Sequence, residues 1–468
     1  AFVAAKLVDK VRINPGNFID KRATFDTKTY TELEWKEELD KIELTLNELI
    51  DICVAHDTAL RIGVNHGSLS DRIMSKYGNT TEGMVESAME FLRICKKRDF
   101  QNVVISLKSS NIRIMNSAYF MLAKQMQTED MHYPLHLGVT EAGNDLSGRV
   151  RSAIGIGRLL GHGIGDTIRI SLTENPVKEI PAAQKLVNHF KHRKPLTDTN
   201  NNWEEYNPLD FSFYYSHEVG NIGGENPVIA VCDIRNYRVL DNVMLEKLGY
   251  KFNGKKWIPT SQAADAVYVK DIEIITELPE NLSVIYEAGT TKMPCENATP
   301  LFNNLEFIYI ADKSKELTKW VSLTNSDLSK SVIIEQLRNS PKTVIVLETV
   351  SQNGYADQMS AFLKLKSAQI TNPVIVKRNY VSDDWETFVI ESSADTGSLL
   401  VGGMGNGVWL TNPFLTDVED NRKLTFEILQ ASRVRISQTE YIACPSCGRT
   451  QFDIESVLAE VRSKTNHL

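Results

Sequence analysis

Cysteine is scarce in this chain. Six cysteines occur among 468 residues, too few and too scattered for the disulfide framework of a small secreted protein. Cys53, Cys95 and Cys232 lie in apolar runs, which predicts buried thiols. Cys295 lies in a loop-like context and suggests no role. This usage is typical of a reducing compartment.

Long apolar runs are also missing. No stretch approaches the roughly 20 apolar residues that cross a bilayer, and the first residues lack the apolar core and cleavage site of a signal peptide. We therefore expect no membrane partner and a cytoplasmic location in a bacterium, or a plastid location if the source is plant-like. The chain begins without Met and almost directly on a strand, so we expect the sequence to be incomplete at that end.

An excess of positive charge is absent as well. The formal net charge is −8, which argues against a nucleic-acid partner but leaves room for a locally positive pocket. No dinucleotide-binding fingerprint occurs: GGMGNG at 402–407 lacks the G-x-G-x-x-G spacing and predicts a turn. The length predicts two or three globular domains.

A repeated strand–helix unit fills the first 175 residues. Stretches such as 31–56 and 83–98 carry apolar residues at three- and four-residue steps, which predicts helices between the strands. Strands that alternate with helices pair in parallel through right-handed crossovers. The simplest fold is an α/β TIM-type (β/α)8 barrel whose first three strands are missing; an open doubly wound sheet is the alternative. The strand candidates are 10–16, 59–65, 102–108, 134–141 and 165–172.

The remaining chain shows two further regions. We expect a partial TIM-barrel domain over 1–180, an inserted α/β barrel-like domain over 181–440, and the beginning of a C-terminal α+β domain over 441–468. The strand-like runs of the inserted region are 227–233, 265–271, 282–289, 305–312, 342–348 and 372–378. These runs end in no shared set of ionisable groups, so we expect a spacer without catalytic residues.

Every strand candidate of the first region ends in polar or charged residues. In a parallel barrel the carboxyl ends of the strands open on one face, where the active site is built. Any one such residue is most often a solvated loop charge, but five consecutive strands that behave alike favour a site. The residues are Arg12, Asn14, Asn17, Arg61, Asn65, His66, Ser68, Ser106, Lys108, Asn111, His136, Thr140, Glu141, Asp166, Arg169 and Ser171.

Four cations dominate this set, and Glu141 is the obvious acid near them. Arginine forks match phosphate oxygens, and lysine supplies a compact charge. The pattern predicts a polyanionic ligand such as a diphosphate, with Glu141 positioning a hydroxyl or delivering a proton. For His136 we favour a structural role. The cations are Arg12, Arg61, Lys108 and Arg169.

Cys444 and Cys447 form a CPSC motif with the spacing of metal ligands. By itself the motif fits half a zinc site, a dithiol redox pair, part of an iron–sulfur site or plain loop chemistry. A zinc ribbon needs a second cysteine pair, and none follows. A thioredoxin-like role needs the motif on the first βα turn of a small domain, which is not its setting.

Several motifs together resemble one enzyme family, the hydroxymethylbutenyl diphosphate synthases. They occur in the family's order, and the long region before the cysteine motif resembles the three-domain form known from plants and some bacteria. The motifs are RINPGN (12–17), RIGVNHGSL (61–69), SLKSSN (106–111), PLHLGVTEAG (134–143), SAIGIGRLL followed by GIGDTIRISL (152–172), and ACPSCGRTQFD (443–453).

The resemblance implies an iron–sulfur oxidoreductase of the non-mevalonate (MEP) pathway of isoprenoid and terpenoid biosynthesis. Such enzymes open 2-C-methyl-D-erythritol 2,4-cyclodiphosphate reductively to 4-hydroxy-3-methylbut-2-enyl diphosphate, with electrons from ferredoxin or flavodoxin passing through a [4Fe–4S] cluster. It implies a catalytic role for Glu141, cluster ligation by Cys444 and Cys447, and a possible homodimer. The implied substrate-binding residues are Arg12, Arg61, Asn65, Lys108, Arg169 and Ser171.

The sequence also departs from the family pattern. The family expects a third cysteine and a glutamate on the cluster, within a GCxVNGPGE-like motif that this sequence lacks, and opening strands with a further arginine. We therefore expect this chain alone neither to hold a stable cluster nor to turn over substrate. Two alternatives remain: a redox-free barrel lyase or aldolase with a Schiff base on Lys108, and an inactive diphosphate-binding remnant.

Overall fold

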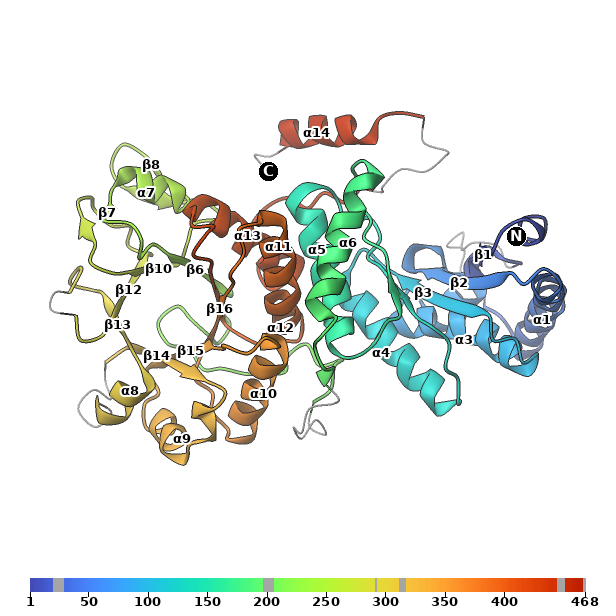
Figure 1. Ribbon diagram of the computed structural model, residues 1–468, viewed down its shortest axis with the longest axis horizontal. Coiled ribbons are helices and arrows are strands. Elements are labelled where there is room, and N and C mark those ends of the chain that lie inside the picture. The colour runs from blue at the N-terminus through green and yellow to red at the C-terminus, as the bar shows by residue number, and fades with distance from the viewer. Residues whose placement is uncertain (20–28, 197–205, 291–292, 311–316, 444–450, 466–468) are drawn as a thin grey trace. The chain divides into compact units, whose positions relative to one another are not determined.

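The structure, a computed structural model, describes residues 1–19, 29–196, 206–290, 293–310, 317–443 and 451–465 (Figure 1). The chain divides into two compact units. The first comprises Ala1–Gly148, Gly155–Gln184 and Ile442–Ile454, and the second Arg149–Ile154, Lys185–Tyr441 and Glu455–Leu468. The division into three domains stays a prediction.

The first unit contains five parallel strands that follow one another in sequence order. β1, β2 and β3 form one sheet, a parallel bridge from Ile105 to Leu135 continues it, and β4 pairs with β5. A doubly wound sheet would reverse its strand order part-way, whereas a barrel does not. The strands therefore form an arc of a TIM-type barrel. They are β1 (Lys10–Ile13), β2 (Ala59–Asn65), β3 (Val103–Lys108), β4 (His136–Leu137) and β5 (Thr167–Ile168).

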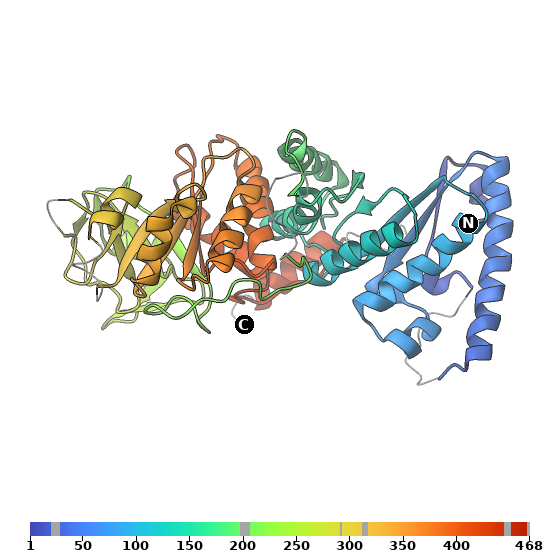
Figure 2. The same ribbon diagram turned by 90° about the horizontal axis from the view of Figure 1, so that it is seen from below.

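Helices cover this arc, as Figures 1 and 2 show in blue to cyan. The first helix begins at a capping box, in which Thr31 and Glu34 bind each other's backbone N–H groups. It packs on α3, which in turn packs on β2 and α4. The helices are α1 (Glu32–Ala55), α2 (Asp71–Tyr77), α3 (Thr81–Lys97), α4 (Ile112–Thr128), α5 (Asp145–Gly161) and α6 (Glu179–Phe190), the last two with residues in both units.

The second unit is built on a closed barrel of eight parallel strands, in which β17 pairs with β6. Large side chains such as Tyr268, Trp320 and Trp409 fill its interior, so the barrel is a packed core rather than a pore. The strands are β6 (Ile229–Asp233), β10 (Ala266–Val269), β12 (Ser283–Glu287), β13 (Thr299–Phe302), β14 (Lys319–Thr324), β15 (Thr343–Glu348), β16 (Val374–Asn379) and β17 (Gly407–Thr411).

Helices and short strand pairs surround the closed barrel (Figure 1). A single π-helical turn, η9 (Ser393–Gly397), follows α11 and continues into α12. These helices are α7 (Asn242–Lys247), α8 (Asn304–Ile310), α9 (Ser331–Arg338), α10 (Gly354–Ser367), α11 (Trp385–Ser392), α12 (Ser398–Val401) and α13 (Val418–Ala431). The last helix of the described chain is α14 (Ile454–Thr465). The short pairs are β7 (Val239–Leu240) with β11 (Glu273–Ile274), and β8 (Tyr250–Phe252) with β9 (Trp257–Pro259).

The structure corrects the strand prediction at one place in the inserted region. The run 305–312 begins in helix α8 rather than in a strand. The Asn303 side chain accepts from the N–H groups of Leu305 and Glu306, while the Glu306 carboxylate accepts from Asn303 N–H. This reciprocal cap commits the apolar run to a helix.

Three strands of the closed barrel were missed in the sequence. β13 contains Pro300, which argues against a strand. β14 opens with Lys319, whose side chain is fully buried. β17 is a short run directly after a glycine-rich turn, which confirms the turn predicted at 402–407.

The closed barrel also ends in ionisable groups, contrary to expectation. Asp233 is the last residue of β6 and Glu348 the last of β15, while Lys377 and Arg378 lie near the end of β16. The premise for a plain spacer is therefore wrong, although a spacer role itself stays a prediction.

Two further expectations concern the buried cysteines and the absence of long apolar segments. Cys53, Cys95 and Cys232 are buried free thiols, as predicted. None of the helices in the described ranges has the length and apolarity needed to span a membrane.

Candidate functional site

A cavity of about 630 Å³ lies at the carboxyl ends of β1, β2 and β3. It is lined almost entirely by polar side chains from the loops that follow these strands, as the strand-end pattern predicts. Two 3-10 turns, η2 (Pro15–Asn17) and η3 (His66–Ser68), form part of its wall. The lining residues are Arg12, Asn14, Asn17, Asn65, His66, Gly67, Ser68, Lys108, Ser109, Ser110, Thr140 and Glu141.

Arg12 is held against the neighbouring strand. Its Nη2 donates to the carbonyl oxygen of Gly63 at 2.8 Å. A Cβ at Gly63 would lie 2.3 Å from Arg12 Nε, so only glycine at this position lets the guanidinium cross β2. Next to it, Asn14 Nδ2 donates to Ser68 Oγ at 2.9 Å, which joins the loops after β1 and β2.

Four cations converge at this rim, and the described residues place fewer acids than cations near them. Burial lowers the pKa of Arg12. Burial also lowers the pKa of Arg61, and the charges of Arg12 and Arg169 lower it further. The Arg61 Nε atom is buried and has no hydrogen-bond partner within the described residues. Charges that repel one another in this way favour the binding of a polyanion between them.

The repulsion between these cations acts most clearly on Lys108, whose pKa is lowered by burial and by three arginines. Burial, followed by the charges of Arg169, Arg61 and Arg12, lowers its pKa to about 8. A Cβ at Gly138 would lie 2.9 Å from the carbonyl oxygen of Arg169 and 3.4 Å from Lys108 Nζ, so glycine lets the backbone approach the Arg169 carbonyl closely beside the ammonium. An anion bound here would restore the ordinary pKa of Lys108 and neutralise the rim.

Glu141 lines the same cavity and has a left-handed backbone with φ of 55°. Residues other than glycine rarely adopt this conformation, and such strain is often concentrated at functional sites. Its carboxylate is the acid among the cavity residues. The geometry is compatible with the predicted role of Glu141, which stays a prediction.

The structure places the other predicted residues less directly. Arg61 and Arg169 do not line the cavity, although their charges act on Lys108. Arg169 Nε lies 3.9 Å from Glu179, a loose ion pair. Ser171 is buried and lies outside the cavity lining, so its substrate-binding role also stays a prediction.

His136 lies behind the cavity, not in it. Its Nδ1 is 2.8 Å from Thr167 Oγ1. Burial, followed by the nearby Lys108 and Arg61 charges, lowers its pKa to about 4. A neutral, hydrogen-bonded imidazole of this kind supports the structural role that the sequence favoured.

Two residues of the strand-end pattern serve the fold instead. Asn111 caps α4, because its Oδ1 accepts from the N–H groups of Arg113 and Ile114. Asp166 lies just before β5, and its carboxylate accepts from Leu135 N–H at 2.8 Å. An asparagine that directly precedes a helical pattern is a cap signal, so the first role was readable from the sequence.

Some functional positions were not singled out in advance. Ser109 and Ser110 line the cavity directly after Lys108. Tyr119, fully buried on α4, accepts from Leu107 N–H at 3.0 Å and donates to the His136 carbonyl at 2.6 Å. It links β3 to β4 next to Lys108, and only the folded chain reveals this contact.

The two predicted cluster ligands, Cys444 and Cys447, lie outside the described residues. The chain before them is placed: Thr173 Oγ1 donates to the carbonyl oxygen of Ala443 at 3.1 Å. This bond brings the backbone that leads into the CPSC motif to the segment after β5. Within the described ranges no group of three or more His, Cys, Asp or Glu side chains is arranged to hold a metal ion.

Comparison with known proteins agrees with this geometry. The family model described as the GcpE TIM-barrel domain matches residues 1–184. A 4-hydroxy-3-methylbut-2-en-1-yl diphosphate synthase (flavodoxin) of Parabacteroides distasonis is 41% identical over all of this chain and 73% of its own length. The chain belongs to the 4-hydroxy-3-methylbut-2-en-1-yl diphosphate synthase family. The family named from the sequence motifs is therefore confirmed.

Other family members match over the whole chain, the closed barrel included. The synthase (flavodoxin) of Phocaeicola vulgatus is 39% identical over the whole chain and 73% of its own length. The chloroplastic synthase (ferredoxin) of Arabidopsis thaliana is 38% identical over the whole chain and 67% of its own length. The chain thus spans about three quarters of the bacterial relatives, and both of its barrels have counterparts in each of them.

Proposed function

We propose that this chain binds 2-C-methyl-D-erythritol 2,4-cyclodiphosphate at the rim of its first unit and takes part in its reductive opening to 4-hydroxy-3-methylbut-2-enyl diphosphate. The observation that carries the proposal is the convergence of four cations with few acids between them: the pKa values of Arg12, Arg61 and Lys108 are lowered, and the charge of Arg169 helps to lower those of Arg61 and Lys108. A cyclic diphosphate supplies the negative charge that this arrangement lacks. The enzyme is accordingly an iron–sulfur oxidoreductase of isoprenoid biosynthesis.

The residues in and around the cavity have different proposed roles. Arg12 and Lys108 hold diphosphate oxygens, the guanidinium fork of Arg61 adds a further contact to the bound substrate, and Arg169 strengthens the field from behind. Asn65 and the serines after β2 and β3 offer neutral hydrogen bonds to hydroxyl groups. Glu141 positions the departing hydroxyl or gives it a proton.

The reduction needs electrons that no amino-acid side chain supplies. We propose that Cys444 and Cys447 contribute two ligands to a [4Fe–4S] cluster, which when bound would supply the two electrons. The support from this structure is the Thr173–Ala443 hydrogen bond, because it starts the cysteine motif beside the barrel strands. The names of the relatives give flavodoxin or ferredoxin as electron donor, and we propose a donor of this small type.

Location and assembly follow the same relatives. The bacterial members favour the cytoplasm and the chloroplastic member favours a plastid if the source is plant-like. A homodimer stays a prediction.

The redox-free lyase or aldolase is the weaker alternative. A Schiff base forms only from neutral Lys108, and a pKa of about 8 makes a larger fraction of this amine neutral than an ordinary lysine pKa does. The lowering comes from burial and three neighbouring arginines, however, and an anionic substrate would reverse the arginine effect. Family membership favours the reductive reaction.

The proposal is tested at Arg61 in the intact enzyme. Arg61→Ala should weaken binding of the cyclodiphosphate by roughly 1.5–3 kcal/mol, the value of a charge-assisted hydrogen bond. Arg61→Lys should lose less, because the charge remains while the fork is lost. Titration calorimetry measures both, with Arg98→Lys as control, because Arg98 directly follows α3, pairs with Asp51 and does not line the cavity. Wild-type affinity in both Arg61 variants would remove this residue from the site.

A further inference from the structure

A second cavity, of about 770 Å³, lies at the carboxyl ends of β14, β15 and β16 in the closed barrel. It belongs entirely to the second unit and so is separate from the site described above. Its wall holds four cationic side chains, Arg193, Lys194, Lys364 and Arg378, against two acidic ones, Asp357 and Glu391. A rim with more cations than acids calls for an anionic ligand.

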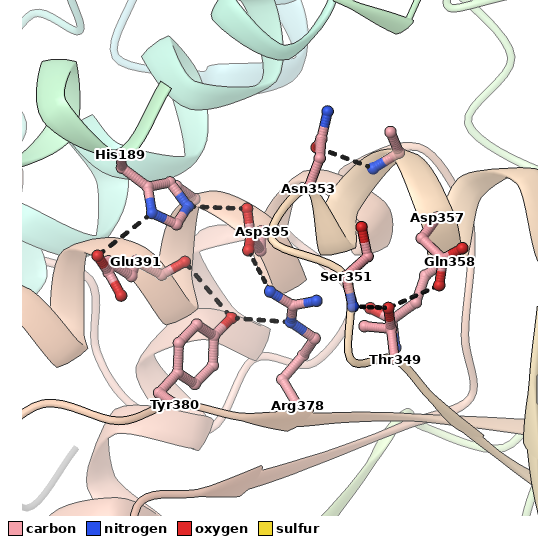
Figure 3. Close-up of polar contacts among 12 residues, drawn as sticks. His189, Thr349, Ser351, Asn353, Asp357, Gln358, Arg378, Tyr380, Glu391 and Asp395 are labelled. Carbon is pink, nitrogen blue, oxygen red and sulfur yellow. Dashed lines mark hydrogen bonds and ion pairs between the residues drawn. The ribbon is translucent and has the colours of Figure 1, made fainter. Parts of the chain in front are cut away.

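Arg378 is the most deeply buried of these cations and leaves one nitrogen atom free. Its side chain is 6% exposed. Nη2 donates to Asp395 at 2.6 Å and Nε to the Tyr380 hydroxyl at 3.3 Å. Within the described residues Nη1 has no hydrogen-bond partner, and Figure 3 shows it pointing away from Asp395 toward the side of Ser351. A buried guanidinium with an unused donor is a ready anion-binding group.

The free nitrogen lies against the start of a helix. A Cβ at Gly354, the first residue of α10, would lie 1.2 Å from Arg378 Nη1. Glycine is therefore required for the guanidinium to reach this turn. The first N–H groups of a helix lack intrahelical partners and carry partial positive charge. Asn353 Oδ1 caps Ala356 N–H at 3.3 Å. The free Nη1 of Arg378 and the start of α10 therefore meet at this point, while Asp395 lies on the Nη2 side of the guanidinium.

Asp395 holds the cationic wall in place but does not neutralise it. Its fully buried carboxylate accepts from His189 at 2.9 Å and from Arg378 at 2.6 Å (Figure 3). It also accepts from Arg193 at 2.6 Å. The surrounding cations keep the pKa of this carboxyl far below its ordinary value despite burial. Asp395 lies in the π-helical turn η9, a distortion that is frequent at functional sites.

The other residues that line the cavity indicate the chemistry of the part of the ligand beyond its anionic group. Apart from Ala356 and Val381, the lining is polar, charged or aromatic, with Asn325, Asp357 and Ser360 among its members. Such a wall suits hydroxyl groups and offers little to a hydrocarbon chain. An isoprenoid product would therefore be a poor fit.

We propose that this cavity binds a small phosphorylated polyol, with its phosphate between Arg378 Nη1 and the first turn of α10. Lys194 also lines this cavity, and its backbone carbonyl accepts from Asn353 Nδ2 at 2.9 Å, which ties it to the cap of α10. The hydroxylated part of the ligand extends toward Asp357 and Lys364. The closed barrel is then a ligand-binding module as well as an inserted domain.

The test uses the intact protein carrying Lys108→Met, which weakens anion binding at the first site. Glycerol 3-phosphate and inorganic phosphate are the probes in titration calorimetry. Arg378→Lys keeps the ion pair with Asp395 but loses the second arm of the fork, and should weaken binding of both probes about tenfold. Lys194→Gln, at an exposed position, should weaken binding a few-fold without affecting folding.

A matched control is Arg235→Lys. Arg235 also follows a strand of this barrel and pairs with a carboxylate, Asp233, but it lines a different cavity. Binding should be unchanged in this variant. The proposal is overturned if the Lys108→Met protein binds neither probe, or if Arg378→Lys and Lys194→Gln bind them as tightly as their parent. Should Arg378→Lys fail to fold by circular dichroism, Lys194→Gln alone decides.

Discussion

The two barrels of this chain treat buried charge in opposite ways. In the first unit, after burial, the charges of Arg12 and Arg169 lower the pKa of Arg61, and all three arginines lower the pKa of Lys108. In the closed barrel most cations at the strand ends are matched: Lys377 lies 2.7 Å from Glu348, and Arg378 lies 2.6 Å from Asp395. The first arrangement is costly until an anion arrives, whereas the second contributes to its own fold.

This difference separates binding from stability. A rim of unmatched cations stores repulsion that a diphosphate relieves, so substrate binding gains what folding loses. A rim of paired charges is stable in the free protein and has less to offer a ligand. The spare nitrogen of Arg378 is the exception, and it marks where the closed barrel retains binding capacity.

We call the strand ends of the closed barrel, with their matched charges, the paired rim, and the strand ends of the first unit, with Arg12, Arg61, Lys108 and Arg169, the open rim. The largest effect should come from disrupting the paired rim. Asp395→Asn keeps the shape of the side chain but leaves His189, Arg193 and Arg378 without their buried carboxylate. We expect a loss of about 3–5 kcal/mol in the free energy of unfolding. Urea unfolding followed by tryptophan fluorescence measures it. The matched change in the open rim, Glu141→Gln, should cost less than about 0.5 kcal/mol, and equal losses would contradict the comparison.

Removing one lysine from each rim should give opposite results. Lys377→Met leaves the Glu348 carboxylate with Ser322 as its remaining partner at 2.7 Å, at a cost of about 1–3 kcal/mol in stability. Lys108→Met should leave stability unchanged or raise it, while diphosphate affinity falls at least about tenfold. Thermal unfolding and calorimetry on the same preparations check both halves. A Lys108→Met protein less stable than Lys377→Met would show that the open rim is not repulsive.

The pH dependence of stability sharpens the same point. The pKa of Lys108 is about 8 in the folded protein, below its ordinary value of 10.5. Between these values the unfolded chain binds more protons at this residue, so its contribution to stability rises with pH from about 8 to 10.5. Diphosphate affinity should fall over the same range as the ammonium loses its proton. The rise should appear in the difference between wild type and Lys108→Met, because the variant lacks the titrating group. A parallel profile for the two proteins would refute the prediction.

The smallest effect concerns two buried tyrosines. Tyr119→Phe leaves the buried N–H of Leu107 without its acceptor, which costs about 1–2 kcal/mol. In the closed barrel Tyr214 only donates, to the carbonyls of Ile370 and Asn372. Since carbonyl oxygens tolerate a lost donor better, Tyr214→Phe should cost less than Tyr119→Phe. Chemical denaturation resolves the order, and the reverse order would contradict the bridging role of Tyr119.

The open rim could be predicted well from the sequence, because each of its residues belongs to the short sequence around one strand. Arg12, Asn65, Lys108 and Glu141 each follow their own strand, and parallel pairing alone brings them to one cavity. Family membership followed from the same motifs. The roles of Asn111 and Asp166 were misread, since a polar residue near a strand end serves equally well as a helix cap or a backbone partner.

The paired rim could not be predicted in this way. His189 and Arg193 come from the end of α6 and the residues after it, about two hundred positions before Asp395. Only tertiary folding brings them together, and no local pattern signals a carboxylate inside a π-helical turn. β14 was hidden for a related reason: the fully buried Lys319 at its start looks in sequence like a surface residue.

The pairing of β17 with β6 closes the barrel, so that it can be inserted into another protein as one unit. The last strand runs parallel to the first, so it is α13, packed on β6, that returns the chain to the starting end of the barrel, where Arg435 Nη1 donates to the carbonyl oxygen of Val228 at 3.2 Å. The two chain ends therefore leave close together, and a host protein needs only one surface loop to accept the barrel. An ancestor could acquire such a module in a single recombination event without straining its own fold. The same adjacency makes the barrel a natural candidate for circular permutation, with new termini placed in any exposed loop of its rim.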